Sequence, residues 1–453
     1  MCKQRKYSFL LLLFCICALG IHARAQDEME YEYDSETEVS DTKSAVQLVV
    51  LKKSYKLGDG LTLRSGNTFL NIRPTLQTLL HVNSDLDNLS KFNSGFSIPR
   101  SRITLVSNLL DKKINLVARI NLPSNNQSTT TEHRSFNTTL QEAYIEYRRS
   151  LAHVFNIGLR ADYIDSRETR FQGENLGFVT RSAISSSFDA IFDYGIRYKG
   201  NYRLKGKHLL RPYISVTTGD SRSALQKNFG GFKYGIRLDY LPFDRFAEGG
   251  EFYMDDLARE SKPKLVVGVV YSYNDGTTSA MGTNGGRWLY GNSKQKVILP
   301  DYEKWGADYM FKYNGFYSLG SYVITRANIP NGITGEFRLN GTFNAYSSSQ
   351  TPAETKNLVR SRLNLGSGLN VQAGYIFPSD IAVGARFTSL KSDEYSAAFA
   401  DYNKFYNLVI TKYLQKHDLK LQMQLGFDQL RQTLKTAESK GNYNIQVMTT
   451  IQL

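Results

Sequence analysis

The connections between the expected strands of this chain alternate in length, and this alternation constrains the fold more than any other feature. From Ile72 to Leu453 the sequence predicts sixteen β-strands, separated alternately by long polar loops and short turns. One connection, after Leu241, is about twenty residues long where a short turn is due. An even strand number with long loops at one end and tight turns at the other is typical of an outer-membrane β-barrel. We therefore predict an all-β fold, a 16-stranded antiparallel transmembrane β-barrel with short periplasmic turns and long extracellular loops. Long loops are expected after Val82, Leu122, Arg160, Thr217, Asn274, Arg326, Thr388 and Phe427.

Hydrophobic alternation within the strands supports this architecture. Between Leu419 and Phe427 every second residue is apolar, which is the pattern of a strand with one apolar face. A soluble β-sandwich shares this period, but its strands average about 5–6 residues, and crossing a bilayer takes about 9–11. The expected strands run for nine to twelve residues. Aromatic residues end six strands at the turn side, where they would form an interfacial girdle: Tyr147, Tyr198, Tyr240, Tyr313, Phe377 and Tyr413.

The N-terminus predicts export. A basic start, an apolar stretch from Phe9 to Gly20 and the sequence Ala23-Arg24-Ala25 have the form of a signal peptide with its cleavage site. A membrane anchor is the alternative, but the apolar stretch is shorter than the ~20 residues that a spanning helix needs. All three cysteines, Cys2, Cys15 and Cys17, lie here, so the rest of the chain has no thiol chemistry. The expected domains are a signal peptide (1–25), an acidic disordered tail (26–44), a periplasmic lead-in (45–71) and the barrel (72–453).

Charge is divided unevenly along the chain. The formal net charge is +14, yet the segment from Asp27 to Lys43 holds eight acidic residues and one lysine. The remainder is therefore strongly basic, which favours anionic solutes or the phosphates of lipopolysaccharide as partners. Nucleic acid is the other usual partner of a basic protein, and the signal peptide argues against it.

Basic residues dominate the strand positions expected to face the lumen. Acidic residues there, such as Asp239, are about half as numerous, so either anion preference or a wall-stabilising ion network fits the pattern. Arg100 and Arg102 share one face at i, i+2 spacing. Their repulsion would be relieved by a bound anion, or by a salt bridge to Glu142 or Glu146. The candidate pore-lining, anion-binding residues are Arg73, Arg100, Arg102, Arg119, Arg160, Arg197 and Arg237.

The loop from Ala161 to Ala190 is the candidate constriction. It carries Arg167, Arg170 and Arg181 together with several acids. A loop of this length either folds inward to narrow a pore or remains on the surface, and the sequence leaves both open. The histidines are dispersed, with no HExxH, GxSxG or P-loop motif, so we predict no enzyme, no metal site and no cofactor.

Several segments resemble the phosphate-selective porin O/P family, in a form typical of Bacteroidetes-type bacteria. Tyr55–Leu61 followed by Phe69–Gln77 is similar to the start of that family's first strand. Phe96–Ile103 resembles its Arg-rich second strand, and Phe232–Phe243 a later strand that ends in a Pro turn. The stretch Leu159–Ile164 departs from the family's pattern. The resemblance implies a sixteen-stranded, usually trimeric, anion-conducting porin.

These observations lead to two main hypotheses. In the first, the protein is a porin in the outer membrane of a Gram-negative bacterium, in contact with lipid and lipopolysaccharide. As a homotrimer, it would let small anionic, phosphate-like solutes diffuse passively. In the second, it is a non-conducting barrel that serves as a structural or assembly subunit of an envelope complex, with Asp27–Asp41 and the loop Ala327–Gly368 as contact surfaces. An Arg-lined constriction that stays open would favour the first, and a filled lumen the second.

Overall fold

The computed structural model describes residues 56–85, 88–110, 113–122, 140–219, 229–279, 288–338, 340–396, 402–430 and 441–453. The predicted signal peptide, the acidic tail and the first part of the lead-in lie outside these residues. The predicted domain bounds therefore remain predictions, whereas the strands of the barrel fall within the described ranges.

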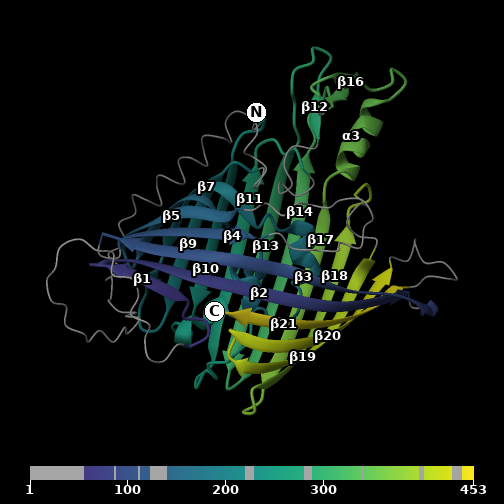
Figure 1. Ribbon diagram of the computed structural model, residues 1–453. Helices are drawn as coiled ribbons and strands as arrows, with labels where there is room; N and C mark the ends of the chain where they lie inside the picture. The colour runs from purple at the N-terminus through teal and green to yellow at the C-terminus, as the bar shows by residue number, and fades with distance from the viewer. Residues whose placement is uncertain are drawn as a thin grey trace.

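Sixteen antiparallel strands of the described chain close into a barrel, which confirms the predicted fold (Figure 1). The ring closes because β21 pairs with β2, with Thr75 opposite Gln452. Closure removes the open sheet edge that a bilayer does not tolerate. The strands are β2 (Thr68–Asp85), β3 (Asn88–Leu109), β4 (Ile114–Asn121), β5 (Leu140–Ser150), β6 (His153–Ala161), β7 (Phe192–Gly200), β9 (Leu209–Thr217), β10 (Lys233–Leu241), β11 (Lys264–Asn274), β13 (Asp301–Tyr313), β14 (Phe316–Asn328), β17 (Gly366–Ile376), β18 (Ile381–Ser392), β19 (Tyr402–Gln415), β20 (Leu419–Leu430) and β21 (Gly441–Gln452).

Two further short strands extend this sheet at the end where the short turns lie. β1 (Leu61–Ser65) forms a hairpin with the start of β2, so part of the predicted lead-in pairs with the barrel. β8 (Tyr202–Arg203) follows β7 and pairs with β9. We refer to this end as the turn end and to the opposite end as the loop end.

The first predicted long loop is wrong. β2 continues past Val82 to Asp85, and β3 begins at Asn88. Val82 lies opposite Ser94, and Ser84 lies opposite Phe92. The strands extend because backbone pairing continues through these polar residues, which sequence polarity alone had marked as a loop. The unusual length of the turn after Leu241 was predicted correctly, since β11 begins only at Lys264.

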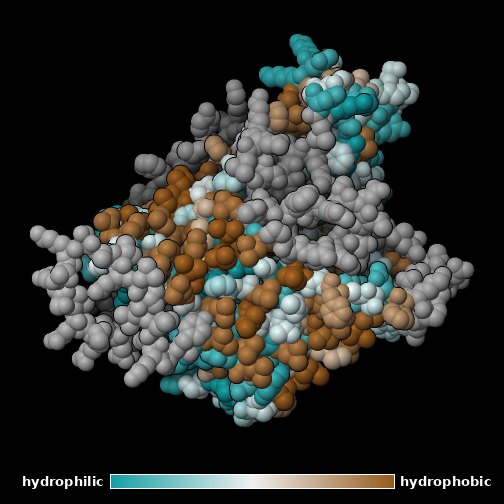
Figure 2. All heavy atoms as spheres, viewed as in Figure 1, coloured by the Kyte–Doolittle hydropathy of each residue, from teal (hydrophilic) through white to brown (hydrophobic). Residues whose placement is uncertain are grey.

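The outer wall carries the apolar side chains of the alternating strands. Trp305, Leu408 and Met423 are all exposed on it, and apolar residues spread over β19, β20 and β21 in the space-filling view (Figure 2). An outward apolar band is what contact with lipid requires. One predicted girdle residue is wrong: Tyr413 is buried and donates a hydrogen bond to Asp255 inside the barrel. The alternation of β19 points Tyr413 into the lumen and its neighbour Lys412 outward.

A small folded unit, which we call the crown, projects from the loop end (Figure 1). It contains a three-stranded sheet and a helix, and a cluster around Tyr290, Ile333 and Val359 forms its core. Thr351 and Glu354 form a reciprocal capping box at the start of the helix, which satisfies two backbone donors there. Among the described residues, no helix is both long and apolar enough to span a membrane. The crown's elements are β12 (Leu289–Gly291), β15 (Gly335–Phe337), β16 (Phe343–Ala345) and α3 (Pro352–Ser361).

Gly158 in β6 provides a test of the wall geometry. Its φ is +126°, and an added Cβ would lie 2.4 Å from the carbonyl oxygen of Ala143 on β5. We expect Gly158→Ala to lower the free energy of unfolding by about 2–3 kcal/mol, because the new methyl meets backbone that cannot move away cheaply. Urea unfolding of the refolded barrel measures this change. Gly206→Asn is the matched control, because Gly206 also has positive φ but no neighbouring atom within 4 Å. An equal loss in both variants would contradict the steric argument.

Candidate functional site in the barrel lumen

A segment from the loop end, residues 162–191, folds into the barrel, and we call it the inner loop. It contains η1 (Arg167–Arg170), η2 (Gly173–Asn175) and α2 (Ala183–Phe188). Lys420 on β20 donates to the carbonyl oxygen of Leu176 at 2.5 Å, and Gln424 accepts from the amide of Val179 at 3.0 Å. The inner loop, which connects β6 to β7, therefore reaches β20 on another part of the wall.

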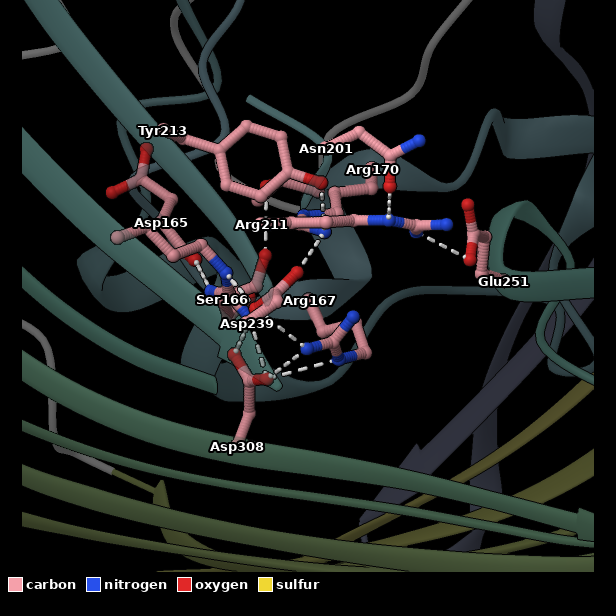
Figure 3. Close-up of polar contacts among 12 residues, drawn as sticks. Asp165, Ser166, Arg167, Arg170, Asn201, Arg211, Tyr213, Asp239, Glu251 and Asp308 are labelled. Carbon is pink, nitrogen blue, oxygen red and sulfur yellow. Dashed lines mark hydrogen bonds and ion pairs between the residues drawn. The ribbon is translucent and has the colours of Figure 1, made fainter. Parts of the chain in front are cut away.

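A buried ion cluster ties the inner loop to the wall (Figure 3). Arg167 donates to Asp308 on β13 at 2.9 Å and to Asp239 on β10 at 3.1 Å. Arg170 donates to the second oxygen of Asp239 at 2.7 Å. Arg237, also on β10, completes the cluster with a 2.5 Å contact to Asp308. Charges that are removed from water in this way remain stable only because each is paired.

Further anchors hold the rest of the inner loop. The ammonium group of Lys304 on β13 pairs with the Asp165 carboxylate and donates to the carbonyl of Phe188 at 3.0 Å. Gly268 on β11 leaves room for the cluster, because a Cβ there would lie 2.4 Å from Arg237. Ile184 and Phe188 of α2 also pack against apolar wall residues of β14 and β18.

A second segment enters from the opposite end of the barrel. Residues 242–263, between β10 and β11, contain η4 (Ala247–Phe252), and we call them the turn insert. Asp255 accepts hydrogen bonds from His417, at 2.9 Å, and from Tyr413. Lys312 on β13 donates to the carbonyl of Gly250 at 2.7 Å. These contacts hold the turn insert against β13 and the β19–β20 turn.

The two inward segments meet inside the barrel. The amide of Met254 donates to the carbonyl of Asn175 at 3.2 Å, and Asn175 donates to the carbonyl of Phe252 at 3.4 Å. An apolar cluster surrounds this contact and joins both segments to the wall. Side chains that line a water-filled lumen are accessible to water. The wall residues of this cluster are buried, so this part of the lumen is filled. The cluster comprises Phe171, Leu176, Phe178, Leu209, Leu241, Phe246, Met254, Val266, Met310, Leu319 and Val409.

The wall from β2 to β6 also has buried lumen-facing side chains, among them Gln77, Thr104 and Glu142, but several of its arginines retain some contact with solvent. Arg119 and Arg160 keep 15% and 13% of their side-chain surface exposed, whereas Arg167 keeps 1% and Arg237 none. Arg73 is also partly accessible. Arg119 pairs with Glu142, and Arg160 lies 3.3 Å from Glu146. Ion pairs therefore occur on both sides of the lumen, and water reaches the basic groups mainly along β2–β6.

Arg100 and Arg102 do not share one carboxylate on a neighbouring strand. Arg100 donates to Gln77 on β2 at 2.5 Å. Arg102 lies 3.4 Å from Glu174 of the inner loop, not from Glu142 or Glu146. Sequence reasoning could not find this pairing, because it depends on where the inner loop enters the barrel.

The remaining candidate arginines make contacts within the protein. Arg197 donates to the backbone carbonyls of Asp193 and Gly158, at 2.7 and 3.2 Å. Arg181 donates to the carbonyls of Phe171 and Glu168 within the inner loop. Their predicted roles in anion binding and constriction remain predictions.

The turn insert and its contact with the inner loop were not predicted from the sequence. The one available signal was the long connection after Leu241, which had no assigned role. The Asp255–His417 pair is also new, and it lies at the turn end beside Lys420. Among the described residues no group of three or more His, Cys, Asp or Glu side chains is placed to hold a metal ion.

The environment of His417 predicts how stability depends on pH. Burial lowers the pKa of His417 from its ordinary value of 6.5, and nearby Lys420 adds to this against the opposing Asp255 carboxylate. Burial alone would raise the pKa of Asp255, but His417, Lys420 and Lys312 outweigh it and bring that pKa to about 2. At neutral pH the hydrogen-bond network fits a neutral imidazole that donates to Asp255 and accepts from Lys420.

We expect His417→Gln to reduce the acid sensitivity of the barrel. Below pH 6.5 the unfolded histidine binds a proton more readily than the folded one, so folding stability decreases as the pH is lowered, by up to about 1.4 kcal/mol per pH unit. Glutamine keeps a neutral donor and acceptor but does not titrate. Urea unfolding between about pH 7 and 5 measures the slope. His208→Gln, at an exposed histidine, should leave the slope unchanged. An unaltered slope in His417→Gln would refute this assignment.

Comparisons with known proteins give only distant structural similarities. No family model and no curated protein matches the chain. Among solved structures, OmpT of Vibrio cholerae is 8% identical, with a TM-score of 0.47 over 87% of this chain and all of that one. The anion-selective porin from Comamonas acidovorans is 10% identical, with a TM-score of 0.47 over 85% of this chain and all of that one. OmpF of Salmonella typhi is 13% identical, with a TM-score of 0.49 over 87% of this chain and all of that one. The evidence for the barrel is therefore its strand pairing, and the resemblance to the phosphate-selective porin O/P family remains a prediction.

Proposed function

We propose that the protein is an outer-membrane porin that lets small anions diffuse through a narrow passage along the β2–β6 wall. The partial exposure of Arg73, Arg100, Arg119 and Arg160 supports this proposal most directly. The inward segments fill the lumen against β9–β14 and β18–β20, so we place the passage beside these arginines. Basic groups lining a confined aqueous path favour anions over cations.

Phosphate-like oxyanions are the solutes that this wall suits best. Guanidinium groups stay charged and bind oxyanions through paired N–H donors. The charge balance along this wall is positive, because Glu142, Glu146, Glu174 and Asp418 face a larger set of bases: Arg73, Arg100, Arg102, Arg119 and Arg160. The expected setting is the outer membrane of a Gram-negative bacterium, with lipid and lipopolysaccharide around a homotrimer.

A second candidate function has support from a different observation. The inner loop, the turn insert and the wall share one apolar cluster, and such a cluster resists hydration. A barrel closed in this way would serve as a structural or assembly subunit of an envelope complex. The crown at the loop end would then be a candidate contact surface for its partner.

Conductance in planar bilayers distinguishes the two functions. The protein without residues 1–25 is reconstituted, and the reversal potential is measured across a KCl gradient with and without phosphate. Stable steps with an anion-signed potential, reduced by phosphate, would support the porin. A correctly folded barrel that gives no steps would overturn the porin proposal in favour of the closed barrel.

Arginine substitutions on the β2–β6 wall test where the anions pass. We expect Arg73→Gln combined with Arg100→Gln to move the reversal potential toward zero and to weaken the block by phosphate several-fold, because two positive charges leave the path. Arg338→Gln in the exposed crown is the matched control and should change neither quantity. Equal anion preference in the double variant and in the Arg338→Gln control would show that the selective groups lie elsewhere.

A further inference from the structure

We propose that the acidic N-terminal segment, Asp27–Lys43, binds to the basic rim at the turn end of its own barrel. This binding does not depend on conduction, and it concerns a surface outside the lumen. The proposal rests on three observations: the charge of the rim, the point where the described chain begins, and the opposite charge of the segment.

The turn end carries exposed basic side chains on several separate connections. They lie after β3, at the end of β5, between β8 and β9, in the turn insert and between β19 and β20. Exposed acids at this end of the described chain are Asp59, Glu248 and Asp380, and Glu248 is already paired with Lys416 at 2.7 Å. The rim as a whole therefore attracts anions. Its exposed bases include Lys113, Arg149, Lys205, Lys207, Lys262 and Lys416.

The described chain begins at this same end. The amide of Gly58 donates to the carbonyl of Gln452 at 3.1 Å, and Gln415 donates to the carbonyl of Leu57 at 3.4 Å. These contacts fix the residues just after Lys56 beside the last strands of the barrel. Whatever precedes Lys56 therefore leaves the barrel at the basic rim.

The tether between Lys43 and Lys56 is long enough for the segment to reach the whole rim. An extended chain of this length spans about 40 Å. Sixteen strands about 4.8 Å apart and tilted by about 40° close a ring roughly 30 Å across. Tethering also gives the segment a high effective concentration at the rim, on the millimolar scale for a short linker.

Charge complementarity identifies the segment as the occupant. Asp27–Lys43 holds eight acidic residues and one lysine. Single exposed ion pairs contribute little, but many weak pairs along a tethered segment add up. Since charges in solvent are screened beyond about 8 Å at physiological salt, the binding must involve direct contact and must weaken as salt is added. Anionic lipid headgroups are the competing occupant of the same bases.

Carbodiimide cross-linking of the protein without residues 1–25, in neutral detergent, tests the proposal. The reagent joins carboxylates directly to amines, and mass spectrometry identifies the linked residues. We expect links from the segment to Lys205, Lys207 and Lys262, and their loss at high salt. Lys294 and Lys296, exposed near the crown at the other end, are the controls and should give none. Cross-links to Lys294 and Lys296 as frequent as those to the rim would overturn the proposal.

Two further experiments distinguish the segment of the same chain from the other possible occupants of the rim, which are a second copy of the protein and lipid. Mixing isotope-labelled and unlabelled protein distinguishes links within one chain from links between copies, and links found only between copies would overturn the intramolecular proposal. A variant with all eight acids of the segment changed to their amides should leave the rim lysines more reactive toward an acetylating reagent. If those lysines are equally reactive with and without the acids in detergent, but protected by vesicles containing phosphatidylglycerol, lipid is the occupant and the proposal is wrong.

Discussion

Replacing Asp239 with asparagine is expected to destabilise the folded barrel by about 3–5 kcal/mol. The Asp239 carboxylate contacts Arg167 and Arg170 of the inner loop and Arg237 of its own strand. These guanidiniums are almost completely buried, so removing their shared partner leaves positive charge in a region without water. Removing one partner of a buried ion pair lowers the free energy of unfolding by far more than the intact pair contributes to it. Urea unfolding, followed by tryptophan fluorescence, measures the loss.

Asp244→Asn is the matched control for this prediction. Asp244 pairs with Arg203 at 3.0 Å, and both side chains keep about a third of their surface exposed. An exposed pair contributes about 0–1 kcal/mol, so this variant should unfold almost like the unmodified protein. The inner loop of Asp239→Asn should also become sensitive to trypsin at Arg167, Arg170 and Arg181. Similar stability in the two variants would contradict the role of the cluster as an anchor.

Shortening the inner loop is expected to raise conductance several-fold. Replacing residues 172–181 by a brief Gly-Ser linker removes Leu176 and Phe178 from the apolar cluster and keeps the anchors at Arg167 and Arg170. Sixteen-stranded barrels are wide enough to hold an aqueous channel once their lumen is cleared. Single-channel recording in planar bilayers measures the step size, and heat-dependent migration in SDS gels checks that the variant has folded.

A variant in which the β15–β16 connection of the crown is replaced by the same linker is the control for the effect of replacing a loop outside the lumen. The crown projects beyond the barrel (Figure 1), so its shortening should leave the step size unchanged. If the inner-loop replacement does not fold, Phe171→Ala combined with Phe178→Ala keeps the backbone of the loop and should still widen the path. A folded variant with unchanged conductance would show that the inner loop does not limit the passage.

The sequence indicated most of the wall but little of the interior. Strand positions followed from alternation, as between Leu419 and Phe427, because each wall residue faces either lipid or the lumen. The hairpin after Val82 was missed because polar residues such as Asn83 and Ser94 pair as well through their backbones as apolar ones. Tyr413 was assigned to the wrong face because an aromatic residue at a strand end suits either an interface or a filled lumen.

The candidate site could be predicted only as a set of residue types. Arg167, Arg170 and Arg237 were identified, but their shared partner Asp239 was one of many lumen acids. The pairing of Arg102 with Glu174 joins residues that are far apart in the chain. Local pattern contains no information about such contacts, since they depend on how the inner loop is folded within the barrel.

By itself, the sequence determined a closed barrel of sixteen strands and its inward and outward faces, and it predicted an excess of basic residues at the lumen-facing strand positions. These properties are local, because alternation and connection length act over a few neighbouring residues. Only the tertiary structure decided which basic groups are fully buried and which remain partly accessible to water. The inner loop and the turn insert cause this difference. Arg167 and Arg237 are buried among carboxylates, whereas Arg73, Arg100, Arg119 and Arg160 on the opposite wall stay partly exposed. Burial and pairing depend on contacts between segments distant in sequence, and these exist only once the barrel has closed around both.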